Sequence, residues 1–211
     1  MYFSPLLTPN KNIDAKDTKK VQLDDTSEIT LHERRLVFEN TIYKVYSDHI
    51  SDKNDHEVKD YLSVEPKVIL DGDVSGVSVL PVNEDKVGLI QIFRHPLGRW
   101  TWEAIKGHVD IGENVSSAAS RELNEEAGFS LNPKCFSSLG VVAPEAGVIK
   151  GRIHLFKVNI QGVEKNPVEG EIGLGEMVFH TREEVFELIA QGRIEDATTI
   201  CILLKDYIVS V

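Results

Sequence analysis

The alternation of apolar and polar residues predicts mostly β-strands in the first half of the chain. Two β-rich runs, LVFENTIYKVY (36–46) and VKDYLSV (58–64), flank the polar stretch SDHISDKNDHE (47–57), which favours an antiparallel hairpin with a loose loop. Next come GVSVLPV (76–82) and VGLIQIF (87–93), joined by a short polar segment. These two runs predict a second hairpin, built from central strands. Trp102 and Glu103 are expected to begin a further short strand after a turn at Pro96 and Gly98.

A helical period appears in residues 107–129, GHVDIGENVSSAASRELNEEAGF. At 100° per residue, Ala118, Ala119 and Leu123 form an apolar stripe, and the carboxylates of Glu122 and Glu126 fall inside the same arc. Glu125 borders this arc. Burying ionised carboxylates costs several kcal/mol unless a partner compensates them. A solvated acidic helix face is the simpler interpretation of an isolated E-x-x-E-E, but the apolar arc argues against it.

Arg121 is the one close cation on this helix, and one guanidinium cannot neutralise three carboxylates. A bound cation is therefore expected beside the helix. Oxygen ligands without nearby Cys or paired His suit a hard ion, Mg²⁺ or Mn²⁺, better than Zn²⁺.

The second half of the chain predicts strands and two further helices. Gly128 suits a helix C′ position, and SLGVVA and RIHLFKVNI form strands around the loop PEAGVIKG. EMVF is a short strand, Thr181 with Glu184 forms a capping box, and Gly192 ends that helix. Asp196 caps a last helix. We therefore expect an α+β fold, an α/β/α sandwich with a mixed sheet between helices. Its expected parts are an extension (1–31), an antiparallel β-hairpin subdomain (32–66) and a main domain (67–211).

Composition narrows the possible partners. The chain has 211 residues, of which 41% are hydrophobic, and a net charge of −11. This charge disfavours a nucleic-acid polymer or an anionic membrane surface as the main partner, because both require a basic footprint. Cys135 and Cys201 show no C-x-x-C spacing, so neither a disulfide framework nor a zinc site is expected. Without a signal peptide or an apolar run of membrane-spanning length, the expected location is the cytoplasm.

The helical stretch also carries a complete motif, G-x5-E-x7-R-E-U-x-E-E-x-G-U, where U is aliphatic or aromatic. The fixed positions are Gly107, Glu113, Arg121, Glu122, Leu123, Glu125, Glu126, Gly128 and Phe129. From average residue usage, a chance match at a given start is on the order of one in 10⁹. The stretch resembles the Nudix box, and the chain is therefore similar to Nudix hydrolases.

This resemblance implies a fold and a chemistry. The chain would hydrolyse a nucleoside diphosphate linked to another group, using divalent metal that screens the phosphate charge and acidifies a bound water. By carry-over, Glu122 and Glu126 would be metal ligands, Glu125 a further ligand or the base, and the Lys106 carbonyl another ligand. We count Arg121 among the catalytic residues, and its expected role is to brace the loop against the helix together with Glu113.

Flanking segments resemble one branch of the family. QIFRHPLGRWTWE before the box and GRIEDATTICILL near the end look like the matching segments of ADP-ribose and other nucleoside-diphosphate-sugar pyrophosphatases. This implies a homodimer formed through the N-terminal β-rich subdomain. Arg94 would face the substrate's phosphates or sugar, and Glu103 would help bind substrate. An ordinary salt bridge is the alternative for Arg94, and Trp100 and Trp102 would either stack on a base or fill a seam.

Two departures from this branch concern the catalytic base and the phosphates. Relatives of the ADP-ribose type place an acid in the loop before the strand matching RIHLF, whereas this chain has Lys150 and Gly151 directly before Arg152. Glu145 is the only carboxylate in PEAGVIKG, so it is the substitute candidate, and Glu125 is the other. The run IKGHVD resembles diadenosine- or inositol-polyphosphate enzymes, in which Lys106 and His108 would meet additional phosphate. The alternative for both residues is a solvated loop.

The sequence thus predicts a metal-dependent pyrophosphatase that acts on a small-molecule nucleoside diphosphate derivative, with ADP-ribose as the leading example. Two alternatives remain open: a diadenosine polyphosphate hydrolase, and a non-catalytic module that binds a nucleotide sugar.

Overall fold

A computed structural model describes residues 28–168, 170 and 172–209. The described chain divides into two compact units, one that ends at Glu65 and one that begins at Pro66. The greater part of the expected N-terminal extension lies outside the described residues. The first strand begins at Ile29, inside the range that we expected for this extension.

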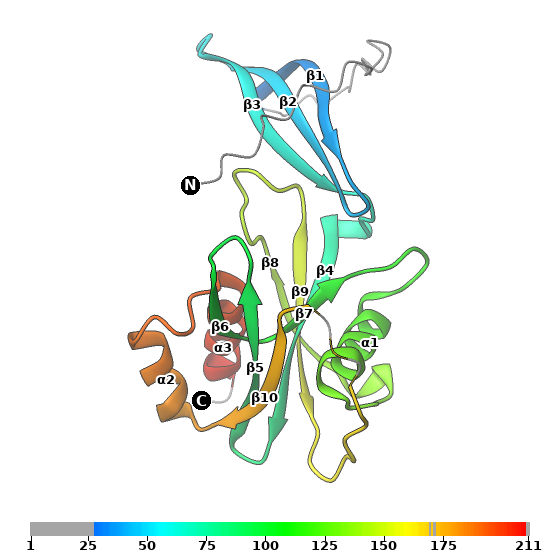
Figure 1. Ribbon diagram of the computed structural model, residues 1–211. Helices are drawn as coiled ribbons and strands as arrows, with labels where there is room; N and C mark the ends of the chain where they lie inside the picture. Colours follow the sequence, from blue (N-terminus) through cyan, green and yellow to red (C-terminus); the bar gives the residue numbers. More distant parts are fainter. Residues whose placement is uncertain (1–27, 169, 171, 210–211) are drawn as a thin grey trace, which may run out of the picture. The chain divides into compact units, whose positions relative to one another are not determined.

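The first unit contains a three-stranded antiparallel sheet (Figure 1) in the order β1-β2-β3. Its strands are β1 (Ile29–Glu39), β2 (Tyr43–Asp52) and β3 (Glu57–Pro66). The prediction of one hairpin with a loose loop at 47–57 was wrong, because β2 continues through the first half of this polar stretch.

Long-range contacts explain why a polar run forms a strand. Asp48 is buried in β2, and its carboxylate accepts hydrogen bonds from Arg34 Nε and Nη2 of β1 (2.9 and 2.8 Å) and from Ser63 Oγ of β3 (2.6 Å). The chain turns at Asn40 and at Asp52, whose side chains accept backbone N–H groups that follow them. Asx turns of this kind supply the two reversals of direction.

The second unit contains a mixed sheet in the order β10-β5-β4-β9-β8, with β6 beside β5 and β7 beside β4. Among the described residues of this sheet, β4 and β9 pair in parallel and the other strand pairs are antiparallel. The strands are β4 (Val74–Asn83), β5 (Lys86–Arg94), β6 (Arg99–Glu103), β7 (Ile105–His108), β8 (Ser137–Val142), β9 (Arg152–Asn159) and β10 (Leu174–His180). Trp102 and Glu103 end β6 instead of beginning a strand.

Strands β4 and β5 separate soon after their turn. Their register holds Val82 opposite Val87 and Asn83 opposite Lys86, so the expected second hairpin is confirmed at its turn end. Further along, β4 pairs with β7 and β5 pairs with β6. This separation admits the segment that leads into residues 107–129, and it places β7 next to the central strand.

Three helices of eight or more residues cover the described sheet (Figure 1): α1 (Val115–Ala127), α2 (Arg182–Ala190) and α3 (Ala197–Val209). Helix α1 packs on one face through a core that includes Ala118, Ala119 and Leu123, whereas α2 and α3 pack on the other through Val185 and Ile202. The predicted α/β/α arrangement is therefore confirmed.

Local capping determines where the helices begin and end. Asn114 caps α1 by accepting the Ser117 N–H, and Gly128 ends the helix in the left-handed region (φ 79°). The capping box of Thr181 and Glu184 and the Asp196 cap of α3 are both present, as predicted. Among the described residues, no helix is long and apolar enough to span a membrane.

Candidate active site

The corner where β7 meets α1 brings a buried carboxylate against a glycine. Glu122 is 8% exposed. A Cβ atom built on Gly107 would lie 1.8 Å from Glu122 Oε1. No side chain fits in that space, so Gly107 is the residue that allows the carboxylate of α1 to reach the backbone of β7.

Arg121 holds the box loop and the box helix together. Its guanidinium donates hydrogen bonds to Glu113 Oε1 and Oε2 (3.2 and 3.0 Å), to Glu122 Oε1 (2.7 Å), to Glu125 Oε2 (3.0 Å) and to the His108 carbonyl (2.8 Å). Burial lowers the pKa of Arg121, but its hydrogen bonds to Glu113 and Glu122 raise this pKa well above its ordinary value. Arg121 and Glu113 thus occupy the bracing positions that we expected for them.

The two predicted metal-ligating glutamates lie one helical turn apart. Glu126 is half-buried, and one of its carboxylate oxygens accepts the Lys106 backbone N–H at 3.3 Å. Glu125 is more exposed and faces Arg121. Within the described ranges, no three His, Cys, Asp or Glu side chains form a complete metal cage.

This donor set nevertheless fits a hard cation. Mg²⁺ usually takes one or two carboxylates and completes its shell with water and substrate phosphates. Glu122 and Glu126 supply two carboxylates beside the backbone of β7, and the two cysteines (Cys135 and Cys201) lie outside residues 107–129.

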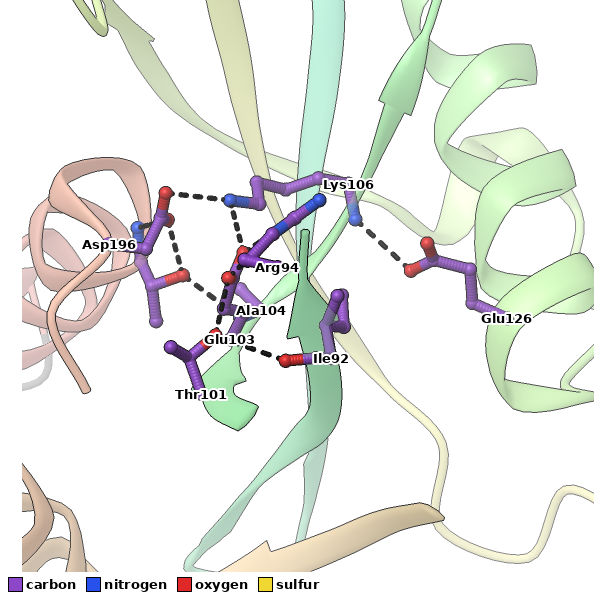
Figure 2. Close-up of polar contacts among 9 residues, drawn as sticks. Ile92, Arg94, Thr101, Glu103, Ala104, Lys106, Glu126 and Asp196 are labelled. Carbon is purple, nitrogen blue, oxygen red and sulfur yellow. Dashed lines mark hydrogen bonds and ion pairs between the residues drawn. The ribbon is translucent and has the colours of Figure 1, made fainter. Parts of the chain in front are cut away.

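A second polar cluster lies beside this corner (Figure 2) and centres on Glu103, which is 1% exposed. Arg94 donates Nε to Glu103 Oε1 (2.8 Å) and Nη2 to Oε2 (2.6 Å). Lys106 Nζ lies 2.6 Å from Glu103 Oε2 and 2.8 Å from Asp196 Oδ1. Thr101 Oγ1 donates to Glu103 Oε1 at 2.7 Å. A single buried carboxylate therefore holds two cations.

Electrostatics keep Glu103 ionised. Burial raises its pKa, but the hydrogen bonds from Arg94, together with the charge of Lys106, lower it to about 2. Both oxygens of this carboxylate already have protein partners. The geometry thus favours a positioning role for Glu103, which fixes Arg94 and Lys106, over direct contact with substrate.

Lys106 connects the two clusters. Its backbone N–H donates to Glu126 of α1, whereas its ammonium group lies between Glu103 and Asp196 (Figure 2). The side chain that we expected to meet substrate phosphate is thus held by carboxylates of the protein itself.

Next to Glu103 lies a pocket of about 330 Å³. Arg94 lines this pocket together with Leu97, Thr101, Glu195 and Asp196. Because two of its guanidinium donors are fixed by Glu103, Arg94 is held in one orientation, with its side chain 39% exposed.

The two candidate bases outside or at the edge of the box differ in their surroundings. Glu145 lies in the turn between β8 and β9, where a Cβ atom on Gly147 would lie 3.6 Å from its Oε1. Gly151, directly before β9, approaches Ser75 so closely that a Cβ atom built on it would lie 2.6 Å from Ser75 Oγ. A side chain at position 151 would require the Ser75 hydroxyl to move.

The remaining candidates are dispersed. Trp102 is buried and contacts the His180 ring edge-on (centroids 4.9 Å apart), which makes it a core residue. Trp100 is exposed and packs against Phe93. His108 contributes its carbonyl oxygen to Arg121.

Sequence reasoning missed Asp196 as a member of this site and treated it only as a helix cap. Asp196 Oδ2 caps α3 by accepting the Thr199 N–H and hydroxyl (2.7 Å each), while Oδ1 faces Lys106. Thr199 Oγ1 in turn accepts the Ala104 N–H at 3.1 Å. The residues next to Asp196 in the sequence, such as Arg193 and Glu195, give no indication that it lies close to Lys106 and Ala104.

A family model of the NUDIX domain matches residues 72–200, more than half of the chain. The chain belongs to the Nudix family. The resemblance of residues 107–129 to the Nudix box is thereby confirmed, and the chain is a Nudix enzyme of the pyrophosphatase type.

Named relatives of this Nudix enzyme include two that act on ADP compounds. It is 34% identical over 98 residues to the ADP compounds hydrolase NudE of Escherichia coli (44% of this chain, 52% of the relative). It is 29% identical over 126 residues to the ADP-ribose pyrophosphatase of Bacillus subtilis (58% and 66%). A longer match, 26% identical over 169 residues (78% and 84%), is to the methanol dehydrogenase activator of Bacillus methanolicus.

A solved structure described as an ADP compounds hydrolase shares the fold. It aligns with a TM-score of 0.70 at 18% identity and covers 88% of this chain and 95% of its own.

Proposed function

We propose that this Nudix enzyme hydrolyses the diphosphate bond of a nucleoside diphosphate sugar, with ADP-ribose as the leading substrate, to give a nucleoside monophosphate and a sugar phosphate. The observation that carries this proposal is the oxygen-rich corner at Gly107, where Glu122 and Glu126 meet the backbone of β7. The names of two relatives, which specify ADP-ribose or ADP compounds, support the choice of substrate.

Glu122 and Glu126, with the Lys106 carbonyl, would hold Mg²⁺ or Mn²⁺. When bound, the cation would neutralise the diphosphate and favour ionisation of the attacking water. Arg121 fixes the orientation of Glu122 and neutralises Glu113 and Glu125 in part. Arg94, oriented by Glu103, presents its remaining donors to a phosphate, which is the geometry in which arginine binds phosphate well.

A single assay tests the substrate class. Purified protein is incubated with ADP-ribose, GDP-mannose, UDP-glucose, diadenosine polyphosphates and NADH, each with Mg²⁺, with Mn²⁺ or with EDTA, and products are identified by chromatography. NADH belongs in the panel because one relative is named an activator of a dehydrogenase. We expect ADP-ribose to be cleaved to AMP and ribose phosphate, and EDTA to abolish the reaction. Failure to cleave any diphosphate sugar would refute the proposal.

The same assay tests the metal site with the variant Glu126→Gln, which keeps the shape of the side chain but removes its charge. We expect kcat to fall by at least ~10²-fold while the fold survives. Turnover at the level of the unmodified protein would remove Glu126 from the metal site.

A diadenosine polyphosphate hydrolase is less well supported. That alternative rested on Lys106 and His108 meeting additional phosphate. Of these two, Lys106 has its ammonium group held by Glu103 and Asp196.

A further inference from the structure

A second and larger pocket, of about 720 Å³, lies between α2, α3 and the turn that joins β4 to β5. Its apolar wall includes Val185, Phe186, Leu203 and Tyr207. Helices α2 and α3 cover the face of the sheet opposite α1 (Figure 1), so this pocket is separate from the Nudix box. We call it the α2–α3 groove.

The apolar surface continues beyond the pocket along α3. This helix is apolar on nearly every side, as is usual for a helix buried in a core. Leu204, which lines the groove, is 55% exposed, and Ile208 and Val209, which lie beyond the groove on α3, are 64% and 68% exposed. Phe186 of α2 is 55% exposed and lies with its ring centroid 6.0 Å from that of Tyr207. Several large apolar side chains exposed at one groove mark an interaction site more often than single exposed residues do.

Negative charges outnumber positive charges at the groove. Glu84, Asp85 and Glu183 line the groove, and none of them forms an ion pair with a residue that the structure describes. The cations beside them are already engaged: Lys157 lies 2.5 Å from Asp206, and Arg182 stacks on Tyr207, 4.5 Å from the ring centroid. The residues that line the groove thus carry four carboxylates (Glu84, Asp85, Glu183 and Asp206) against two cations, which leaves a net charge of −2 around an apolar floor.

We propose that the α2–α3 groove is a docking surface for an amphipathic helix of another protein, one whose apolar stripe is bordered by Lys or Arg. Helices dock in this way, with side chains at i, i+3, i+4 and i+7 entering an apolar groove. The carboxylates of Glu84, Asp85 and Glu183 complement basic residues at the margin of such a stripe, which gives specificity and speeds association. A small ligand is a poorer fit, because small ligands are buried on most sides, whereas this surface runs on over exposed residues of α3.

The experiment uses the full chain and two synthetic peptides of fourteen residues with the same leucine stripe. One peptide carries Lys and the other Glu at every polar position, and binding is measured by fluorescence anisotropy. We expect the Lys peptide to bind at least about tenfold more tightly than the Glu peptide, with an affinity that falls as salt rises. Equal binding of the two peptides, or no binding of the Lys peptide, would overturn the proposal.

Variants of the protein test whether the peptide binds in the α2–α3 groove. Phe186→Ala and, separately, the triple variant Glu84→Gln, Asp85→Asn, Glu183→Gln change exposed side chains, so the fold should persist. Each should weaken binding at least about fivefold. Matched controls are Ile172→Ala, an exposed apolar residue outside the groove, and Glu164→Gln, an exposed acid elsewhere. Unchanged binding by the groove variants would overturn the proposal, as would loss of self-association in Phe186→Ala, which would assign the surface to a second copy of this chain.

Discussion

At the scale of single residues, the site is organised by carboxylates whose surroundings differ. Glu122 is buried against Gly107, Glu103 is saturated by Arg94 and Lys106, and Glu125 stands at the surface beside Arg121. The spacing of the box predicted which glutamates share a helix face. It did not predict that Lys106 is bound by Glu103 and Asp196. Asp196 lies far from Lys106 in the sequence, directly before the last helix, so no local pattern indicates this contact.

At this scale, we expect Glu125 and not Glu145 to act as the catalytic base. Glu125 lies on α1 with the proposed metal ligands, whereas the Glu145 carboxylate lies against its own turn at Gly147. We therefore expect Glu125→Gln to lower kcat by about 10²-fold or more and Glu145→Gln to change it by less than about threefold, measured with saturating ADP-ribose. The reverse order would identify Glu145 as the base.

Gly107 is the residue whose substitution should be most specific. In Gly107→Ala, the new Cβ atom would occupy the place of the Glu122 carboxylate, so that carboxylate must move. We expect kcat to fall by roughly 10²-fold and stability to fall by about 1–3 kcal/mol. Gly170→Ala is the control, because its Cβ atom would have open space around it. Full activity in Gly107→Ala would show that Glu122 needs no contact with β7.

The lowered pKa of Glu103 predicts how stability depends on pH. Because the pKa falls from 4.5 in the unfolded chain to about 2 in the folded state, its contribution is complete above pH 4.5 and is lost as pH falls toward 2. This contribution is on the order of 3 kcal/mol at neutral pH. Urea unfolding of the unmodified protein and of Glu103→Gln should therefore show a gap in stability at pH 7 that narrows by pH 3. A constant gap would contradict this assignment.

At the scale of elements, helix ends and most strands of the second unit were predictable, whereas the extents of the strands in the first unit were not. Helix caps contact backbone groups only a few residues away, so the local sequence is enough to predict them. The capping residues here are Thr181, Glu184, Asp196 and Gly128. Strand β2 was missed because its polar residues find partners on β1 and β3, which no local pattern reveals. The separation of β4 from β5 likewise depends on β6 and β7, whose pairings are also distant in sequence.

Asp196 provides a prediction at this scale, since one carboxylate both caps α3 and binds Lys106. Asn is as good a cap as Asp, so Asp196→Asn should keep the cap but weaken the ion pair, whereas Asp196→Ala should lose both and cost about 1 kcal/mol more. Both variants should lower kcat roughly tenfold by releasing Lys106.

The control for these variants is Thr181→Ala, which removes the cap of α2. It should lower the free energy of unfolding by about 1 kcal/mol and leave kcat unchanged. Equal losses of kcat in all three variants would reduce Asp196 to a cap.

At the scale of the whole molecule, we propose a homodimer formed through the N-terminal sheet. This sheet exposes several large apolar residues, including Phe38 (56%) and Leu62 (49%), more than a small isolated sheet would tolerate in water. Light scattering should give twice the mass of one chain, and Phe38→Ser with Leu62→Ser should shift it toward the monomer. Phe186→Ser on α2 is the control. A monomer in the unmodified protein would refute this proposal.

Helix α3 has a mechanical consequence. Its thirteen residues span about 20 Å, with Asp196 and Lys106 at one end and the exposed Ile208 and Val209 at the other. A rigid rod cannot tilt at one end without moving the other. A shift of the far end of α3 would thus change the distance between Asp196 and Lys106. We therefore expect substitutions at Ile208, which lies far from the proposed substrate, to alter kcat in the assay with ADP-ribose.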